Sequence, residues 1–152
     1  MKKIFFVFTL AMAAFHYASS QSAQSVYFEL GGPGIASFNY DLRFSGRQGG
    51  LGGRIGFGSS IDGNSVLYLP LGINYLIGKE KHFFEMGAGV TPVFGVDYPG
   101  DSVLSELFVH LLFGYRFQPI NDGFIFRVFI CPVYNSNDFV PYYFGLSAGY
   151  KF

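Results

Sequence analysis

The chain has 152 residues, enough for one domain, and it carries 10 basic and 10 acidic side chains for a formal net charge of zero. Charged residues make up only 13% and aromatic residues 20%, which excludes an intrinsically disordered chain, since such chains are rich in charge and poor in aromatics. Few charges together with many aromatics and 21 glycines are typical of a heavily buried or lipid-facing β-protein.

The first segment, residues 1–20, has the three-part layout of a secretory signal peptide. Two lysines are followed by an apolar run over residues 4–15, and the small residues Ala18 and Ser20 suit cleavage after position 20. The alternative is a short membrane anchor, but this apolar run is shorter than the roughly 20 residues that a spanning helix needs. We therefore predict a signal peptide at 1–20 and one exported domain at 21–152.

The exported domain lacks the features of a nucleic-acid-binding or disulfide-stapled protein. Removing Lys2 and Lys3 from the 10 basic side chains leaves 8 against 10 acidic ones, a net charge of −2, with no clustered basic face. Cys131 is the only cysteine, so no intramolecular disulfide can form, although an exported chain could carry one. Another source of stability is required.

After the signal peptide, apolar residues alternate with small or polar ones, and this period of two predicts β-strands rather than helices. The clearest runs are "IASFNYDLRF" (35–44), "ELFVHLLFGYRF" (106–117) and "FGLSAGYKF" (144–152). Seven clusters of turn-forming residues separate the runs. We predict eight strands, over residues 25–31, 35–44, 51–57, 66–77, 83–94, 104–117, 124–134 and 142–152.

The two registers of these strands differ in chemistry. One is apolar and nearly free of charge in all eight runs, and a soluble protein would not expose so large an apolar surface. Its aromatic residues near strand ends match the girdles that barrels place at membrane interfaces, namely Tyr75, Tyr115, Phe117, Tyr150 and Phe152. We therefore predict an all-β fold, an eight-stranded antiparallel up-and-down transmembrane β-barrel. Closure of the barrel would give the backbone N–H and C=O groups hydrogen-bond partners where no water is available.

The other register consists mostly of Gly, Ser, Asn and Tyr with isolated charges. Eight strands leave room inside for little more than side chains, and buried charges are costly unless paired, so we expect a plugged lumen with a ladder of ion pairs. The pairing is left open because the strand registers are unknown. The predicted structural network consists of Glu29, Asp41, Arg43, Arg54, Glu85, Arg116 and Arg127. Glu106 and Lys151 fall in the same register, and we expect the Lys151 head to reach water at the rim.

Several stretches resemble a known family: "VYFELGGPGIASFNYDLRF", "YLPLGINYLIGK", "FFEMGAGVTPVF", "FGYRFQP" and "GLSAGYKF". In this order they are similar to the small outer-membrane β-barrel proteins of Gram-negative bacteria. The resemblance implies a location in the outer membrane with both mature termini in the periplasm. It also implies that the C-terminal strand, with Tyr150 and Phe152, is recognised by the barrel-assembly machinery. The family offers no catalytic residues to carry over.

Other chemistries have weaker support in the sequence. A lipid-modifying enzyme would need a nucleophile, a His and a carboxylate within reach, and only Ser105, Glu106 and His110 are close in sequence, with Ser105 facing the opposite side of a strand. A secreted soluble barrel with an apolar ligand is the other alternative. We expect no enzyme activity, no cofactor and no metal, since His82 and His110 lack ligands at suitable spacing. The expected partners are the lipid bilayer and the assembly machinery, with the chain a monomer.

Overall fold

The computed structural model describes residues 22–60, 66–96, 102–135 and 138–152. The predicted signal peptide lies outside these ranges. Strand segments and one 3-10 turn make up the regular structure, and no helix of the described residues is long and apolar enough to cross a membrane. The elements are β1 (Gln24–Gly31), η1 (Gly32–Gly34), β2 (Ala36–Arg43), β3 (Gly50–Ser59), β4 (Val66–Tyr68), β5 (Leu71–Lys79), β6 (His82–Val96), β7 (Ser102–Phe117), β8 (Gly123–Ile130), β9 (Val133–Tyr134), β10 (Phe139–Val140) and β11 (Phe144–Lys151).

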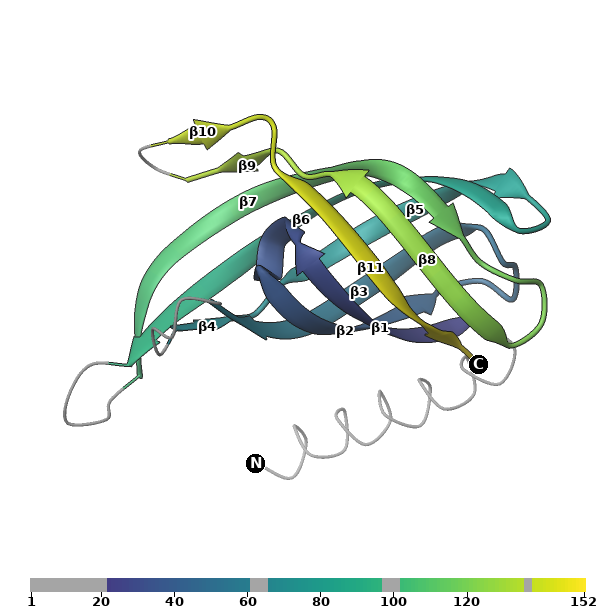
Figure 1. Cartoon of the computed structure of the whole chain (residues 1–152), viewed down its shortest axis with the longest axis horizontal. Coiled ribbons are helices and arrows are strands. Elements are labelled where there is room, and N and C mark those ends of the chain that lie inside the picture. Colours follow the sequence, from purple (N-terminus) through teal and green to yellow (C-terminus); the bar gives the residue numbers. More distant parts are fainter. Residues whose placement is uncertain (1–21, 61–65, 97–101, 136–137) are drawn as a thin grey trace, which may run out of the picture.

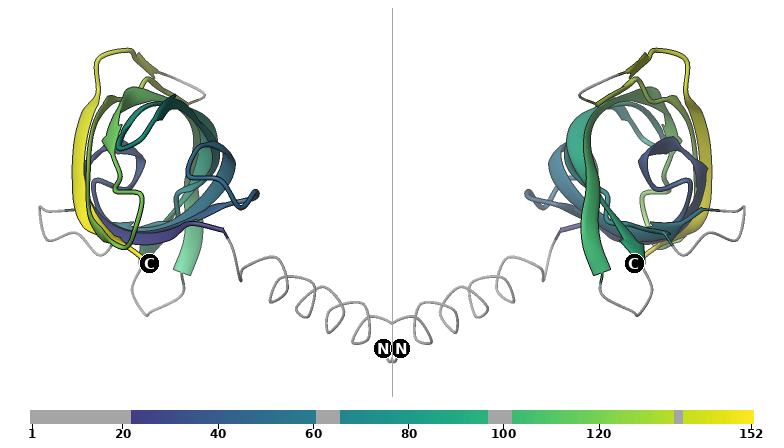
Figure 2. Two further views of the ribbon diagram at one scale, coloured as in Figure 1. Left: turned by 90° about the vertical axis from the view of Figure 1, so that its right-hand side faces the viewer. Right: turned by 90° about the vertical axis from the view of Figure 1, so that its left-hand side faces the viewer.

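These segments form a closed eight-stranded antiparallel barrel, as predicted. Each strand pairs with its sequence neighbours, and β11 closes the barrel on β1 from Ser25 opposite Lys151 to Gly31 opposite Gly145. Backbone hydrogen bonds between Gln24 and Phe152 extend this closure by one residue, at 2.9 and 3.3 Å. Figure 2 shows the strands as a closed ring from either end. The closure satisfies backbone groups that an open sheet would leave unpaired.

Two of the eight barrel strands are interrupted, where the sequence predicts continuous ones. The fourth is split into β4 and β5 at Leu69 and Pro70, and the seventh into β8 and β9 at Cys131 and Pro132. Proline has no amide hydrogen to donate to a ladder, which accounts for both breaks. The wall remains joined across them, because the Pro70 and Pro132 carbonyls accept bonds from neighbouring strands at 2.8 and 2.9 Å. The eighth strand, β11, is continuous within its predicted range, and the short β10 forms in the predicted turn before it and pairs with β9.

The barrel has two unlike ends. Figure 1 shows the C-terminus at the end where short turns join β5 to β6 and β7 to β8, and we call this the terminal end. At the opposite end β6 and β7 reach beyond the shorter strands (Figure 1). The first connection there, η1, folds into buried space, and Gly31 and Gly32 adopt φ values of 74° and 70° that favour glycine.

The side chains sort by register as the period of two predicts. The outward register is apolar and exposed, and it includes Phe38 on β2, Ile73 on β5, Leu111 on β7 and Val128 on β8. Phe28, Phe38 and Phe57 pack side by side on this outer face, with ring centroids 5.0 and 5.8 Å apart. The inward register carries the buried polar and charged side chains, together with apolar ones such as Leu76, Ile125 and Phe129. The fold is thus apolar outside and charged inside.

Candidate functional site in the barrel interior

The inward register brings all seven residues of the predicted network together. None of their side chains is more than 6% exposed. They come from six barrel strands, and each arginine contacts at least one carboxylate. The ion pairs form one continuous chain in the order Arg43, Asp41, Arg116, Glu85, Arg127, Glu29 and Arg54.

One half of this network is built around Asp41 on β2. Its carboxylate accepts from Arg43 two residues along the strand, at 2.7 and 2.8 Å, and from Arg116 on β7 at 3.2 Å. Arg116 also donates to Ser25 Oγ at 3.0 Å and lies 3.8 Å from Glu85. A strand places residues i and i+2 on one face, which explains how Asp41 and Arg43 meet in the interior.

The other half is built around Arg127 on β8. Its guanidinium holds Glu85 of β6 in a two-point contact, with Nε at 2.8 Å and Nη2 at 3.0 Å, and its Nη1 donates to Glu29 of β1 at 3.0 Å. Arg54 of β3 contacts the other oxygen of Glu29 at 2.9 Å. The Arg127 guanidinium also lies over the Tyr27 ring, 4.5 Å from its centroid. Such two-point contacts are among the strongest that arginine makes.

Uncharged residues that sequence reasoning did not single out complete the network. Asn74 of β5 donates to Asp41 at 2.6 Å and to Glu85 at 2.8 Å, and its oxygen accepts from Arg43. Asn39 accepts from Arg54 at 3.1 Å, and Ser147 accepts from Arg127 at 3.3 Å. Their position in the charged register was the available signal, since that register faces the same interior.

Glycines of β3 make room for these long side chains. A Cβ at Gly52 would lie 2.2 Å from the Arg43 guanidinium, and one at Gly56 would lie 2.3 Å from the Asn39 side chain. The Gly-rich stretch at 49–58 therefore serves the packing of the interior, as expected of glycines in a curved barrel strand.

Two charges of the inward register depart from the prediction. Glu106 is exposed and accepts a hydrogen bond from Asn135, because β7 there extends past the barrel and its register against β6 shifts between Val93 and Phe94. Lys151 does not reach water: it is 4% exposed, and its Nζ donates to the carbonyls of Pro119, Ile120 and Asn121 at 3.3, 2.8 and 3.1 Å. The turn between β7 and β8 thus covers the lysine head.

His110 and Glu106 of the candidate catalytic cluster lie in different environments. His110 is buried, with its Nδ1 3.4 Å from the Thr91 Oγ1, whereas Glu106, four residues earlier, is exposed. His82 begins β6 and shares a 2.7 Å hydrogen bond with the Tyr115 hydroxyl. No group of three or more His, Cys, Asp or Glu side chains within the described ranges is arranged to hold a metal ion.

The proposed assembly residues lie on the outer surface of the closing strand. Tyr150 and Phe152 are about half exposed, at 53% and 50%, and both belong to the apolar register. Phe152 is also held through its backbone, which exchanges hydrogen bonds with Gln24.

The fold is similar to a solved structure, the N-terminal β-barrel domain of OprF from Pseudomonas aeruginosa. The similarity has a TM-score of 0.63 at 12% sequence identity, and it covers 87% of this chain and 98% of that domain. At this identity it bears on the fold alone. No protein-family model matches the sequence, and a comparison with curated proteins yields no match.

Proposed function

We propose that this chain is an integral outer-membrane β-barrel protein with a structural or surface-interaction role. In this proposal residues 1–20 are removed on export, residues 21–152 form the barrel, and both mature ends lie in the periplasm of a Gram-negative bacterium. The observation that carries it is the inside-out distribution of side chains: an apolar outer register on a closed sheet, around a buried ionic interior.

A lipid environment accounts for both halves of that distribution. The outer register exposes large apolar side chains on every strand of the barrel, a surface that water would destabilise. Within a bilayer, barrel closure supplies partners for all backbone groups, and aromatic residues suit the interface. Tyr75, Tyr115, Tyr150 and Phe152 lie on the outer surface toward the terminal end, as an interfacial girdle requires.

The buried ionic network supports a plugged lumen and a role without catalysis. Its arginine and carboxylate groups are engaged with one another, and the Arg116–Asp41 pair joins β7 to β2 on the opposite wall, so they brace the barrel rather than line an aqueous path. No conductance in planar-bilayer recordings of the purified protein is the expected result. Stepwise currents would contradict the plugged lumen.

The proposed partners follow from the surface of the barrel. The bilayer contacts the outer register, and the barrel-assembly machinery would recognise β11, where Tyr150 and Phe152 are accessible. A monomer meets these requirements, since lipid covers the apolar face without a second copy.

The deciding experiment separates the membranes of cells that express the chain and compares boiled with unboiled samples on a detergent gel. We expect the chain in the outer-membrane fraction, with a heat-dependent shift in mobility that reports the folded barrel. Recovery in the soluble fraction without a shift would overturn the proposal in favour of a secreted soluble barrel.

A second experiment tests the enzyme alternative. If a His110→Ala variant alters the lipid A composition of the cells, the enzyme alternative is favoured, whereas unchanged lipid A supports the non-catalytic role.

A further inference from the structure

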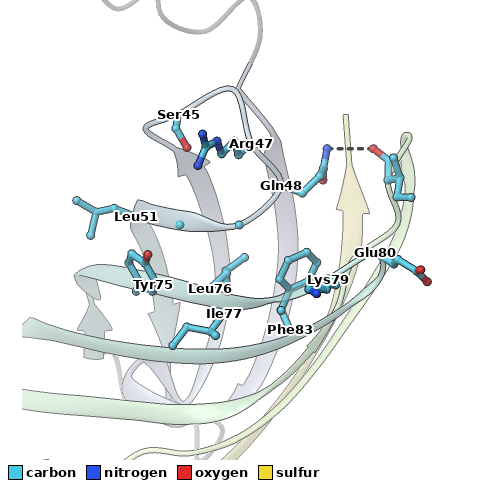
Figure 3. A pocket seen from close by; sticks show the side chains of 14 residues that line it. Ser45, Arg47, Gln48, Leu51, Tyr75, Leu76, Ile77, Lys79, Glu80 and Phe83 are labelled. Carbon is cyan, nitrogen blue, oxygen red and sulfur yellow. Dashed lines mark hydrogen bonds between the residues drawn. The ribbon is translucent and has the colours of Figure 1, made fainter.

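A notch interrupts the barrel wall at the terminal end, between β3 and β5. The ladder that joins these strands ends where Gly50 pairs with Leu76, whereas β5 continues to Lys79 and pairs there only with β6. The chain before Gly50 bends away as the turn from β2 to β3. Beside the notch lies a groove of about 960 Å³, which Figure 3 shows from close by.

The turn that forms the upper edge of the groove is held in place. Gln48 donates to the carbonyl of Ile120 at 3.0 Å, the contact drawn as a dashed line in Figure 3. The buried Gln118 side chain in turn donates to the backbone and side-chain oxygens of Gln48 at 3.1 and 3.0 Å. These bonds link the β2–β3 turn to the β7–β8 turn, and they hold Gln48, the residue that follows Arg47.

The groove combines an apolar floor with a cationic rim. Leu51, Tyr75 and Ile77 form the floor; each is about half exposed, and they continue the outward apolar face of the barrel. Arg47 and Lys79 lie at the rim, both exposed and without an acidic partner among the described side chains. Glu80 also lines the groove, but Figure 3 shows its carboxylate pointing away from Arg47 and Tyr75.

We propose that this groove binds one anionic phospholipid, with the phosphate between Arg47 and Lys79 and an acyl chain along Leu51, Tyr75 and Ile77. Arginine suits phosphate because its planar fork can donate two hydrogen bonds, and lysine adds a second charge. The apolar floor leads directly from this headgroup position onto the lipid-facing wall, which a soluble phosphate compound would not require. The inference rests on the proposed membrane location of the barrel.

The test uses the processed chain, purified from membranes in dodecyl maltoside and titrated with phosphatidylglycerol or phosphatidylcholine while native mass spectrometry counts bound lipid. We expect phosphatidylglycerol to bind more tightly than phosphatidylcholine. Arg47→Gln and Lys79→Gln should each weaken phosphatidylglycerol binding by about fivefold, the upper range for an exposed charge pair. Lys81→Gln is the matched control, since it removes the same charge nearby but outside the groove, and it should leave binding unchanged.

Each other outcome overturns a distinct part of the inference. Equal binding of the two lipids, or an equal loss in the Lys81→Gln control, would show general charge attraction and no groove site. Displacement of phosphatidylglycerol by an equal concentration of glycerol phosphate would point to a soluble ligand. A heat-shift gel on the same samples separates the two proposals: a folded membrane barrel without lipid preference overturns this inference alone, whereas a chain absent from membranes overturns the proposed function.

Discussion

Arg127 is the residue on which the interior network depends most. Its guanidinium is fully buried, and it contacts the carboxylates of both Glu29 and Glu85. Burying charges has a large desolvation penalty that only close, well-oriented partners offset. Removing Arg127 would therefore leave two buried carboxylates with fewer positive neighbours.

Replacing Arg127 with Met should destabilise the barrel by about 3–5 kcal/mol, because the buried Glu85 then keeps only the 3.8 Å contact with Arg116 and Glu29 only that with Arg54 among the described ion pairs. Urea unfolding of the refolded protein in lipid vesicles, followed by the gel mobility shift, measures the loss. Glu85→Met and the Arg127→Met/Glu85→Met double variant complete a double-mutant cycle. The double variant should lose clearly less stability than the sum of the single losses. Additive losses would contradict direct coupling between these side chains.

Strand alternation predicted the inward position of the seven network residues but was wrong for Glu106, and it did not predict which residues pair. Alternation alone assigns Glu29, Arg54 and Arg127 to one face of their strands. It does not indicate that Glu29 lies between Arg54 of β3 and Arg127 of β8, because that depends on the stagger of strands around the closed ring. The role of Asn74 is not predicted for the same reason: an amide in a polar register indicates a hydrogen-bonding role only when the neighbouring strands and their residues are known.

At the scale of the element, β11 closes the barrel through a close backbone approach. Gly149 lies opposite Tyr27 of β1, and a Cβ at this position would lie 2.1 Å from the Val26 carbonyl oxygen and 2.4 Å from the Tyr27 Cβ. The Val26 oxygen is a backbone atom and the Tyr27 Cβ is bonded directly to the backbone, so neither atom can move without a shift of β1. The glycine is thus required for β11 to pair with β1.

Gly149→Ala should lower the stability of the barrel by about 1–3 kcal/mol, the range for overpacking. The same urea titration in vesicles measures this change. Gly53→Ala is the matched control, because its Cβ would meet the outward Phe44 ring at 3.0 Å, which can rotate away. The control should lose less stability than Gly149→Ala. An equal loss in both variants would mean that the glycine effect is unrelated to closure.

The aromatic residue at the end of β11 allows a test of assembly that leaves the stability of the barrel nearly unchanged. Because Phe152 pairs with Gln24 through its backbone, Phe152→Ala removes only the exposed ring. We expect less folded barrel in the outer membrane of cells, measured by the heat-shift gel, and nearly unchanged unfolding of the protein refolded in vitro. Phe144→Ala, at the other end of the strand, is the control and should assemble normally. Equal loss of assembly in both variants would argue against a terminal signal.

Period-two patterns located all eight barrel strands but not their interruptions. Pro70 and Pro132 remove an amide donor, yet proline is tolerated in strands at edges and bulges, so the sequence alone does not decide between a break and a continuous strand. The structure resolves this through the proline carbonyls, which still accept from Gly56 and Leu111. The extension of β7 to Ser102, beyond the predicted start at 104, likewise depends on its pairing with β6.

At the scale of the whole molecule, the decisive property is which side of the wall meets water. A soluble barrel and a membrane barrel share the same strand pairing, and they differ in the surroundings of the outer register. Here that register carries Leu111 in the middle of β7 and Ile77 near the terminal end of β5, both exposed. These two positions therefore report the environment at different depths.

Leu111→Arg should destabilise the barrel in a bilayer by about 2–4 kcal/mol, whereas Ile77→Arg should cost only about 0–1 kcal/mol, because a charge is most costly at the bilayer midplane. Urea unfolding in vesicles of the two variants, with Leu111→Ala and Ile77→Ala as controls for lost side-chain volume, measures the difference. In water both arginines would extend freely from an exposed wall, so a soluble barrel would tolerate them equally. A dependence on depth is therefore the signature of a lipid-facing wall, and equal small effects at both positions would contradict the membrane assignment.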